Sequence, residues 1–476
     1  MTIVNTEPET TSARYVTGLT QLGAGLLDAA IGTMRDVLTL DPSHAGARRN
    51  LVRALIAAGD YEAVIAETAL VPLRASDTAE LHFLRGTAFN AMSRPVEARE
   101  ALTRAVALNP GLAPAWLNLG NAMMDLDELT EAESHCRQAL DLDPTLIEAH
   151  VSLGFILTAQ GRVEEAIGAL EEAIRIEPGN VQAHWNLASA ALLAGDLPRG
   201  FAEYEWRKRH DLFRRDFINL PGPIWNSTEP NGQTILVHAE QGLGDTVQFA
   251  RYLTLIARRG GKPILACEPA LIPLLSTVGE GQVISKFEAL PSYDAWIDQM
   301  SLPHVFGTVL DTIPSPSGYV RADATRVVAF RAGLPTARRV GLAWSGNTRH
   351  RNDRRRTPPV DVFTPLLAVP DCHFVSLVPD QVLPGTAPPP LPLTDFAETA
   401  ALIAALDLVI TVDTSVAHVA GALGCPAWLL LPYAPDWRWL LDRNDTPWYD
   451  SLHLFRQPSP GDWRSVIGAV ATALAG

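Results

Sequence analysis

A spacing of 34 residues organises the first half of this 476-residue chain. Proline recurs at that spacing at Pro110, Pro144 and Pro178, and Pro42 stands two spacings before Pro110. Such a repeat predicts antiparallel helix pairs stacked into a solenoid, because small residues let two helices approach and proline ends the second helix. The small residues in register are Gly18, Gly86, Gly120, Gly154 and Ala188, and turn residues follow seven positions later at Gly25, Gly59, Ser93, Asp127, Gly161 and Gly195.

The segment from Trp116 to Pro144 resembles the tetratricopeptide-repeat consensus, and the resemblance extends over about residues 15–210. It implies a superhelix with a concave groove that holds a polypeptide. Several aromatic and imidazole side chains of the repeats can line this groove or serve only in packing: Trp116, His150, His184 and Trp185.

From Thr234 the pattern changes to short apolar runs rich in branched residues, each followed by a loop and a helical segment. This alternation predicts parallel sheets in two Rossmann-like halves, so the fold class is an α-solenoid followed by α/β. The aromatic and basic segment 200–217 suits a capping helix that docks on the next domain, or else a basic ligand patch. The predicted parts are a disordered tail 1–14, the repeat array with its capping helix 15–217, a linker 218–230, and the halves 231–325 and 326–476.

Composition excludes several other classes of protein. A net charge of −15 argues against a duplex nucleic-acid binder, which normally has a basic surface. The four cysteines form no CxxC motif, which predicts a reduced protein with no zinc site. The N-terminus lacks the apolar core of a signal peptide, so we expect a cytoplasmic protein. The apolar stretch 400–431 is interrupted by Asp407, Asp413 and His418, so we expect buried strands and helices there rather than a membrane span.

Ligands of parallel sheets bind outside the carboxyl ends of the strands, so site residues are expected in the loops that follow the apolar runs. The first loop, AEQGLGD, holds two glycines and ends at Asp245, near a predicted helix N-terminus. Asp245 can cap this helix or act as a general base, and the loop alone favours neither. Glu240 is the second candidate base.

Two further loops carry residues suited to phosphate. The loop SGNTRHRNDRRRTPP contains five arginines, which form either a solvated basic turn or a diphosphate-binding segment. The position of the loop directly after a predicted strand favours diphosphate binding. Asp413, Thr414 and Ser415 precede or begin a predicted helix, where free N–H groups favour phosphate oxygens. His418 lies one turn further on and can also be a buried structural residue. The aromatic loop 432–449 suits a sugar platform or packing across the two halves.

Four long segments of these loops resemble bacterial proteins that fuse tetratricopeptide repeats to a GT-B domain related to heptosyltransferases, glycosyltransferase family nine. The segments are HAEQGLGDTVQFARYL, AWSGNTRHRNDRRRTPP, LVITVDTSVAHVAGALGCPAWLLLP and APDWRWLLDRNDTPWYDSLHLFRQ. The resemblance implies that Asp245 is the base and that Asp413, Thr414 and His418 lie near the donor phosphates. One strand ends in Val378 where that group usually has glutamine, so this polar side chain is missing.

We therefore expect a glycosyltransferase that moves a sugar, with inversion, from a nucleotide-sugar to a polypeptide held by the repeats. Flagellin is a candidate acceptor, because some members of the resembling group modify it. The α/β half has no Asp-x-Asp motif, so we expect no metal and no cofactor besides the nucleotide-sugar co-substrate. A glycan or lipopolysaccharide transferase and a non-catalytic repeat scaffold are the alternatives. The predicted donor-binding residues are Gln241, Gly242, Gly244, Gln248, Trp344, Gly346, Asn347, Arg351, Asn352, Asp353, Arg356, Asp413, Thr414, Ser415, His418, Asp436 and Arg438.

Overall fold

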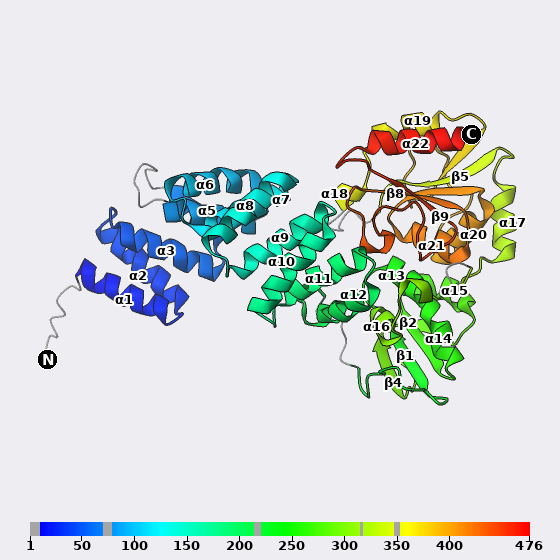
Figure 1. The fold of residues 1–476 in the computed structure, drawn as a ribbon, viewed down its shortest axis with the longest axis horizontal. Helices are drawn as coiled ribbons and strands as arrows, with labels where there is room; N and C mark the ends of the chain where they lie inside the picture. The colour runs from blue at the N-terminus through cyan, green and yellow to red at the C-terminus, as the bar shows by residue number, and fades with distance from the viewer. Residues whose placement is uncertain (1–9, 70–78, 214–219, 315–317, 347–352) are drawn as a thin grey trace, which may run out of the picture. The chain divides into compact units, whose positions relative to one another are not determined.

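The predicted fold class is confirmed, because a helical solenoid precedes an α/β part with parallel sheets (Figure 1). The contacts divide the chain into two compact units, one of Met1–Ala159 and Gly168–Gly179, the other of Gln160–Ile167 and Asn180–Gly476. None of the helices in the described ranges combines the length and the apolar character that a bilayer crossing requires. The computed structural model describes residues 10–69, 79–213, 220–314, 318–346 and 353–476.

Antiparallel helix pairs that follow the 34-residue spacing build the first unit. Helices approach closely where the repeat has a small residue: a Cβ added at Gly86 would lie 2.4 Å from Leu102 Cγ, and one at Gly154 equally close to Leu170 Cγ at 2.4 Å. Larger side chains would force these helices apart, which explains the register of small residues. The helices up to residue 176 are α1 Thr11–Gly23, α2 Leu27–Leu40, α3 Ala45–Ala58, α4 Tyr61–Ala69, α5 Ala79–Ala91, α6 Pro95–Leu108, α7 Ala113–Asp125, α8 Leu129–Leu142, α9 Ile147–Ala159 and α10 Val163–Ile176.

The recurring turn residues end helices in the left-handed backbone conformation. Gly59 has φ 75°, and Ser93 and Asp127 reach φ 57° and 68° in the same register without being glycine. At Asp127 the chain turns back, and the N–H of Glu128 donates to the Met123 carbonyl at 2.9 Å. This bond satisfies a carbonyl of the last helical turn, so the turn residue closes the helix. The repeat prolines stand two residues after the ends of α2, α6, α8 and α10.

The second unit contains a four-stranded and a five-stranded sheet, and every strand pairing in them is parallel. The first sheet has the order β3-β2-β1-β4 and the second β6-β5-β7-β8-β9. The strands are β1 Thr234–His238, β2 Lys262–Cys267, β3 Gln282–Ser285, β4 Ala295–Asp298, β5 Arg338–Ala343, β6 Cys372–Ser376, β7 Leu408–Val412, β8 Ala427–Leu431 and β9 Leu452–Arg456. The apolar runs seen in the sequence became β1, β2 and β5 to β8, whereas β3, β4 and β9 were not predicted.

Helices cover both sheets, and two of them follow the strands that matter for the site: α13 after β1 and α21 after β7. The helix predicted from Thr246 begins at Leu243 and is interrupted by the 3-10 turn η4 Ala250–Tyr252. The helices of the second unit are α11 Val181–Leu193, α12 Leu197–Tyr204, α13 Leu243–Phe249, α14 Leu253–Arg258, α15 Ile272–Leu275, α16 Leu302–Val305, α17 Ala324–Ala332, α18 Asp353–Arg356, α19 Thr364–Leu367, α20 Phe396–Ala405, α21 Ser415–Leu423 and α22 Trp463–Ala475.

The end of the repeat array belongs to the hydrophobic core of the second unit. Phe201 of α12 is buried and contacts Phe249 and Trp437 in edge-to-face geometry, with ring centroids 6.4 and 5.6 Å apart. Tyr204 is buried in the same cluster. The contacts therefore group α11 and α12 with the α/β part, while the boundary predicted at residue 217 stays a prediction.

Candidate functional site

Asp245 lies in the first turn of α13, after the glycine loop that follows β1. Its Oδ2 accepts the N–H of Gly242 at 2.9 Å, and its Oδ1 accepts from Arg438 Nη2. The carboxylate thus caps the start of α13 and is also held by a cation from the second half of the unit. Both interactions fix the direction of this side chain, which is 20% exposed.

Arg438 joins the two halves at this point. Its Nε donates to Gln248 Oε1 at 2.6 Å and its Nη1 to Asp436 Oδ1 at 2.7 Å, while its guanidinium stands over the Trp437 ring at 4.2 Å. Burial opposes its charge, but the carboxylates of Asp436 and Asp245 outweigh that effect and raise the pKa of Arg438. A buried arginine with two carboxylate partners stays charged, so Asp245 always has a cation beside it.

The second sheet presents a group of polar residues at the carboxyl end of β7. Thr414 caps α21, because its Oγ1 accepts the N–H of Val416 at 3.3 Å. Arg356 Nη1 donates to the backbone carbonyl of Asp413 at 2.9 Å. A Cβ added at Gly346 would lie 2.8 Å from Arg356 Nη2 and 2.9 Å from Thr414 Cγ2. The loop after β5, the arginine segment and the start of α21 therefore meet at one edge.

Asp413, at the carboxyl end of β7, is half-buried. Burial, and next to it the carboxylate of Asp436, raise the pKa of Asp413 to about 6, although Trp439, Arg438 and Arg356 pull in the opposite direction. A carboxyl group in that range changes charge near neutral pH.

Gly244 brings the two halves into contact. A Cβ added there would lie 2.7 Å from His418 Cδ2 and 3.5 Å from Ser415 Cα, so α13 and α21 pack directly on each other (Figure 1). The buried His418 accepts or donates a hydrogen bond with the Tyr449 hydroxyl at 2.9 Å and stacks on Trp439. Burial, together with Arg438 and Arg251, holds the pKa of His418 well below its usual value, so the ring is neutral. These contacts favour the structural interpretation of His418.

Glu240, the second candidate base, lies deeper. Its Oε1 accepts from Arg207 Nη2 at 2.9 Å and from the N–H of Met300 at 3.1 Å, and its side chain is fully buried. Burial raises the pKa of Glu240, against the effect of Arg207. This carboxylate holds two segments together inside the protein, which suits a structural role better than contact with an acceptor.

His238, Glu240 and Asp298 bring one ligand atom each within 4.8 Å of one another, which is the spacing of a metal site. Two cations already compensate these carboxylates, because Arg207 pairs with Glu240 and Lys208 Nζ lies 3.3 Å from Asp298 Oδ2. The cluster is therefore better described as a buried ion network than as a metal site.

The structure describes some of the remaining predicted residues. Gln248 and Trp344 are buried, and Gln241 Oε1 accepts the Tyr204 hydroxyl at 2.9 Å. Asp353 begins the short helix α18. Three predicted donor-binding residues lie outside the described residues: Asn347, Arg351 and Asn352.

Sequence reasoning missed Tyr204 and Arg207, which hold the glycine loop from the side of the repeats. The signal available was the departure of the segment 200–217 from the repeat pattern. Arg251, buried among Tyr319, Trp448 and Tyr449, was also missed, and nothing in its local sequence distinguishes it from a surface arginine of a helix.

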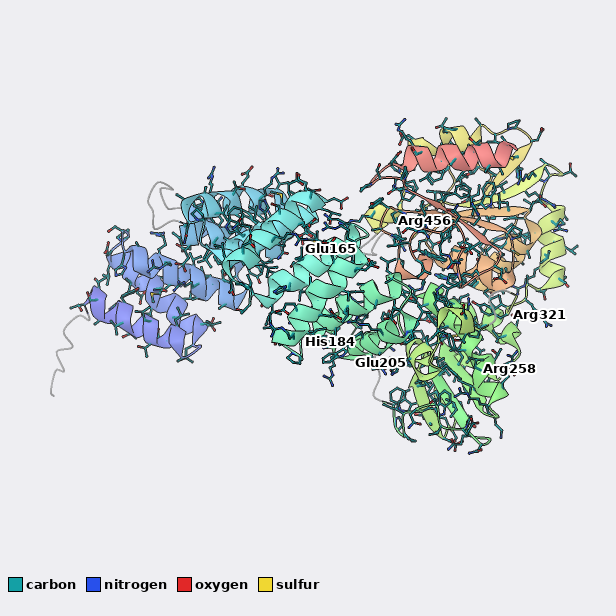
Figure 2. All side chains as sticks on the ribbon, viewed as in Figure 1. Glu165, His184, Glu205, Arg258, Arg321 and Arg456 are labelled. Carbon is teal, nitrogen blue, oxygen red and sulfur yellow. The ribbon has the colours of Figure 1, made fainter. Side chains whose placement is uncertain are left out.

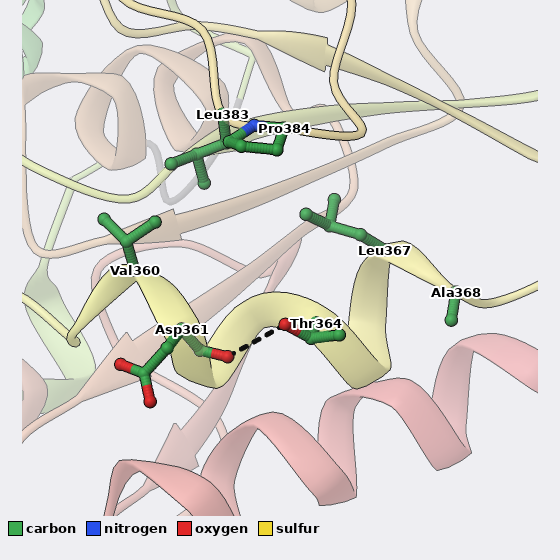
Figure 3. Close-up of a pocket in the computed structure, with 7 residues that line it drawn as sticks. All are labelled: Val360, Asp361, Thr364, Leu367, Ala368, Leu383 and Pro384. Atoms are coloured by element: carbon green, nitrogen blue, oxygen red, sulfur yellow. Dashed lines mark hydrogen bonds between the residues drawn. The ribbon is translucent and has the colours of Figure 1, made fainter.

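Two cavities of the described part of the chain are lined by residues other than the predicted site residues. One of about 440 Å³ lies along η9 Val360–Phe363 and α19, where Thr364 donates to the Asp361 carbonyl at 3.0 Å (Figure 3). Another of about 530 Å³ is lined by the end of α11, the start of α10 and the loop 440–445. None of the predicted site residues that the structure describes lines either cavity.

Comparison with known families supports both resemblances read from the sequence. A tetratricopeptide-repeat model matches residues 21–86, and the middle TPR-like domain of cilia and flagella-associated protein 70 matches residues 91–197. Glycosyltransferase family 9 (heptosyltransferase) matches residues 390–430, the segment that holds β7, Asp413, Thr414 and α21. The resemblance to a repeat protein with a family-nine glycosyltransferase domain is thus confirmed.

Individual relatives match parts of the chain. Protein FlbA of Caulobacter vibrioides is 29% identical over 326 residues, which cover 60% of this chain and 54% of FlbA, so the chain spans about half the length of that relative. Among solved structures, the MamA protein is 25% identical with a TM-score of 0.33, covering 36% of this chain and 94% of its own. The thermophilic TPR protein TTC0263 of Thermus thermophilus is 23% identical with a TM-score of 0.33, covering 38% and 100%.

Proposed function

We propose that the second unit is an inverting, metal-independent glycosyltransferase of the GT-B type, and that the repeats hold a polypeptide acceptor. One observation carries the proposal: Arg356, Thr414 and the start of α21 meet at the carboxyl end of β7, and α21 packs against the helix that carries Asp245. A phosphate-binding edge and a carboxylate from the opposite half are the two parts that glycosyl transfer needs.

The donor side has the chemistry of a diphosphate site. The Arg356 guanidinium brings a positive charge to the edge, and the N-terminus of the nine-residue helix α21 adds backbone dipoles of the same sign. A side chain at position 346 would collide with Arg356 and Thr414, so the glycine lets these two residues lie close to the loop after β5. We expect the diphosphate of a nucleotide-sugar between these groups, with the second sheet carrying the nucleotide.

On the acceptor side, Asp245 is the proposed base. It takes the proton of an acceptor hydroxyl while that oxygen forms a bond to the anomeric carbon of the sugar. The bond from the anomeric carbon to the phosphate oxygen breaks, and the nucleoside diphosphate leaves with the electron pair. Arg356 and the helix terminus stabilise the charge that develops on the leaving group, so the step needs no metal.

Intact mass spectrometry of a co-expressed polypeptide tests this proposal. The chain is expressed with flagellin from the same organism and, separately, with a pool of its other abundant polypeptides. A mass increase equal to one or more sugar residues, which disappears with Asp245→Asn, is the expected result. Modification of lipopolysaccharide or another glycan, with no polypeptide modified, would show that the acceptor assignment is wrong.

A non-catalytic scaffold is the second candidate, and the state of Asp245 favours it. Both carboxylate oxygens accept hydrogen bonds from within the protein, from Gly242 and from Arg438. A scaffold would bind no nucleotide-sugar, or would bind it without transfer or hydrolysis, whereas the enzyme releases the nucleoside diphosphate at a measurable rate.

A further inference from the structure

The turn after the last repeat helix contacts the glycine loop of the α/β part. This turn, η2 Glu205–Arg209, contains Arg207, whose side chain is completely buried. Arg207 Nη2 donates to Glu240 Oε1 at 2.9 Å and to Ser301 Oγ at 2.8 Å. One guanidinium therefore binds the loop after β1 and the segment after β4 at the same time.

Tyr204 holds the next residue of the same loop. Its hydroxyl donates to Gln241 Oε1 at 2.9 Å, and Gln241 has φ 67°, a left-handed conformation that is unfavourable for a residue with a side chain. The residue that follows is Gly242, whose N–H fixes Asp245 Oδ2. Two consecutive residues before Gly242 are thus held by side chains from the end of the repeat array.

The end of α12, which supplies Tyr204, and the turn η2, which supplies Arg207, are themselves held by α11. His184 stacks flat on Trp206 with ring centroids 3.7 Å apart and an interplanar angle of 3°, and its Nδ1 lies 2.5 Å from Glu203 Oε2. Lys208 reaches Asp298 at 3.3 Å and Glu205 at 2.7 Å. Figure 2 labels His184 and Glu205, which mark the helix and the turn.

We infer that Arg207 and Tyr204 are positioning residues of the transferase: they fix the backbone of residues 240–242, and through Gly242 they keep the Asp245 carboxylate aimed at the acceptor. This inference rests on the proposed function. In that proposal the donor phosphates contact the second sheet, and the loop 240–242 acts on the acceptor side, although Gln241 and Gly242 were predicted to bind the donor. The end of the repeat array then controls turnover rather than donor affinity. The catalytic module then begins at α11 and includes the final helix pair of the array.

Three variants and one control test the inference. Tyr204→Phe removes only the hydroxyl that binds Gln241, Arg207→Ala removes the buried cation, and Arg207→Lys keeps its charge. Arg209→Ala is the matched control, because Arg209 belongs to the same turn but is exposed and stands over the Trp206 ring at 4.6 Å. Each protein is examined by hydrogen–deuterium exchange of residues 239–249, and by steady-state kinetics with the UDP-, GDP-, ADP-, dTDP- or CMP-sugar that the wild type turns over.

We expect Tyr204→Phe to lower kcat about threefold to tenfold and to change the donor KM by less than about twofold, as the loss of one oriented hydrogen bond predicts. Arg207→Ala should lower kcat more, and Arg207→Lys should restore part of it. Exchange in residues 239–249 should rise in Tyr204→Phe and Arg207→Ala but not in Arg209→Ala.

Several results would overturn the inference. Exchange in Tyr204→Phe equal to that of the wild type would show that the hydroxyl does not hold the loop, and this readout needs no turnover. A looser loop with unchanged kcat would refute the positioning role while leaving the proposed function intact. If the wild type turns over none of the donors, the proposed function has failed, and the inference fails with it even where the loop becomes looser.

Discussion

Replacing Asp245 by asparagine separates its two roles, since the amide can still accept the Gly242 N–H but no longer carries charge. With its oxygen turned to Gly242, the amide places its NH2 group beside Arg438 Nη2, so the charge-assisted hydrogen bond to Arg438 is lost. The side chains are 20% and 8% exposed, so solvent screens the pair weakly, and the loss in unfolding free energy should be about 1–2 kcal/mol. A loss of that size lowers the melting temperature by about 2–6 °C.

The effect on turnover is expected to be far larger than the effect on stability. Loss of a general base lowers the rate by about 10²–10⁴-fold, while the donor affinity should stay nearly constant because the donor phosphates lie on the second sheet in our proposal. Turnover is measured as release of nucleoside diphosphate in the presence of acceptor, and donor affinity by calorimetry.

Asp407→Asn is the matched control for this variant. Asp407 accepts the backbone N–H of Arg339 at 2.8 Å and the Arg339 guanidinium at 2.7 and 3.0 Å, so it combines a backbone donor with an arginine as Asp245 does. It precedes β7 at the opposite end of the sheet. The control should lose a comparable or smaller amount of stability and keep its turnover. Wild-type turnover in Asp245→Asn would refute the base assignment and leave Asp245 as a helix cap.

Two further predictions concern charge and the limits of the folded module. The pKa of Asp413 is raised from 3.8 to about 6 in the folded protein, so its contribution to stability is greatest below the unfolded-state pKa and declines as the pH rises from that value to the folded-state pKa. Protonation of Asp413 also removes a negative charge beside the proposed donor phosphates. Donor affinity should therefore rise about threefold to tenfold on going from about pH 7.5 to about pH 5.5. Asp413→Asn should abolish this pH dependence. A wild-type donor affinity that falls with acidification would contradict the placement of the donor phosphates beside Asp413. A fragment of residues 160–476 should unfold cooperatively and bind donor. A fragment of residues 218–476 lacks the buried Phe201 and Arg207, so it should have a much lower melting temperature in thermal denaturation. Equal melting temperatures of the two fragments would show that the final helix pair is dispensable for stability.

Much of the fold could be predicted because its signals are local and periodic. The small residue at Gly86 and the turn residue at Asp127 belong to a register that repeats along the chain, and the structure uses both as that register implies. The four-residue strands β3 and β4 were not predicted, because so short a segment shows no usable periodicity.

The loops that form the candidate site could be predicted from the sequence, but the side-chain pairs within the site could not. Position after a strand identified Asp245 and Thr414, and the structure brings their helices together. The pairing of Asp245 with Arg438 joins residues far apart in the chain, and no local pattern specifies such a pair. The same holds for Arg207, whose partner Glu240 lies in another element. For the arginine loop, the structure describes a side-chain contact at Arg356, and this contact is with the backbone of Asp413.

The central claim is that a nucleotide-sugar binds at the edge formed by Arg356 and the start of α21. Isothermal titration calorimetry of the full chain with UDP-, GDP-, ADP-, dTDP- and CMP-linked sugars, in buffer with EDTA, tests it most directly. Arg464→Ala serves as the control, because Arg464 is exposed on α22. We predict that at least one donor binds without metal, that Arg356→Ala weakens this binding about 10- to 100-fold, and that Arg464→Ala leaves it unchanged. Binding by none of the donors, or equal affinity in Arg356→Ala and the wild type, would contradict the account.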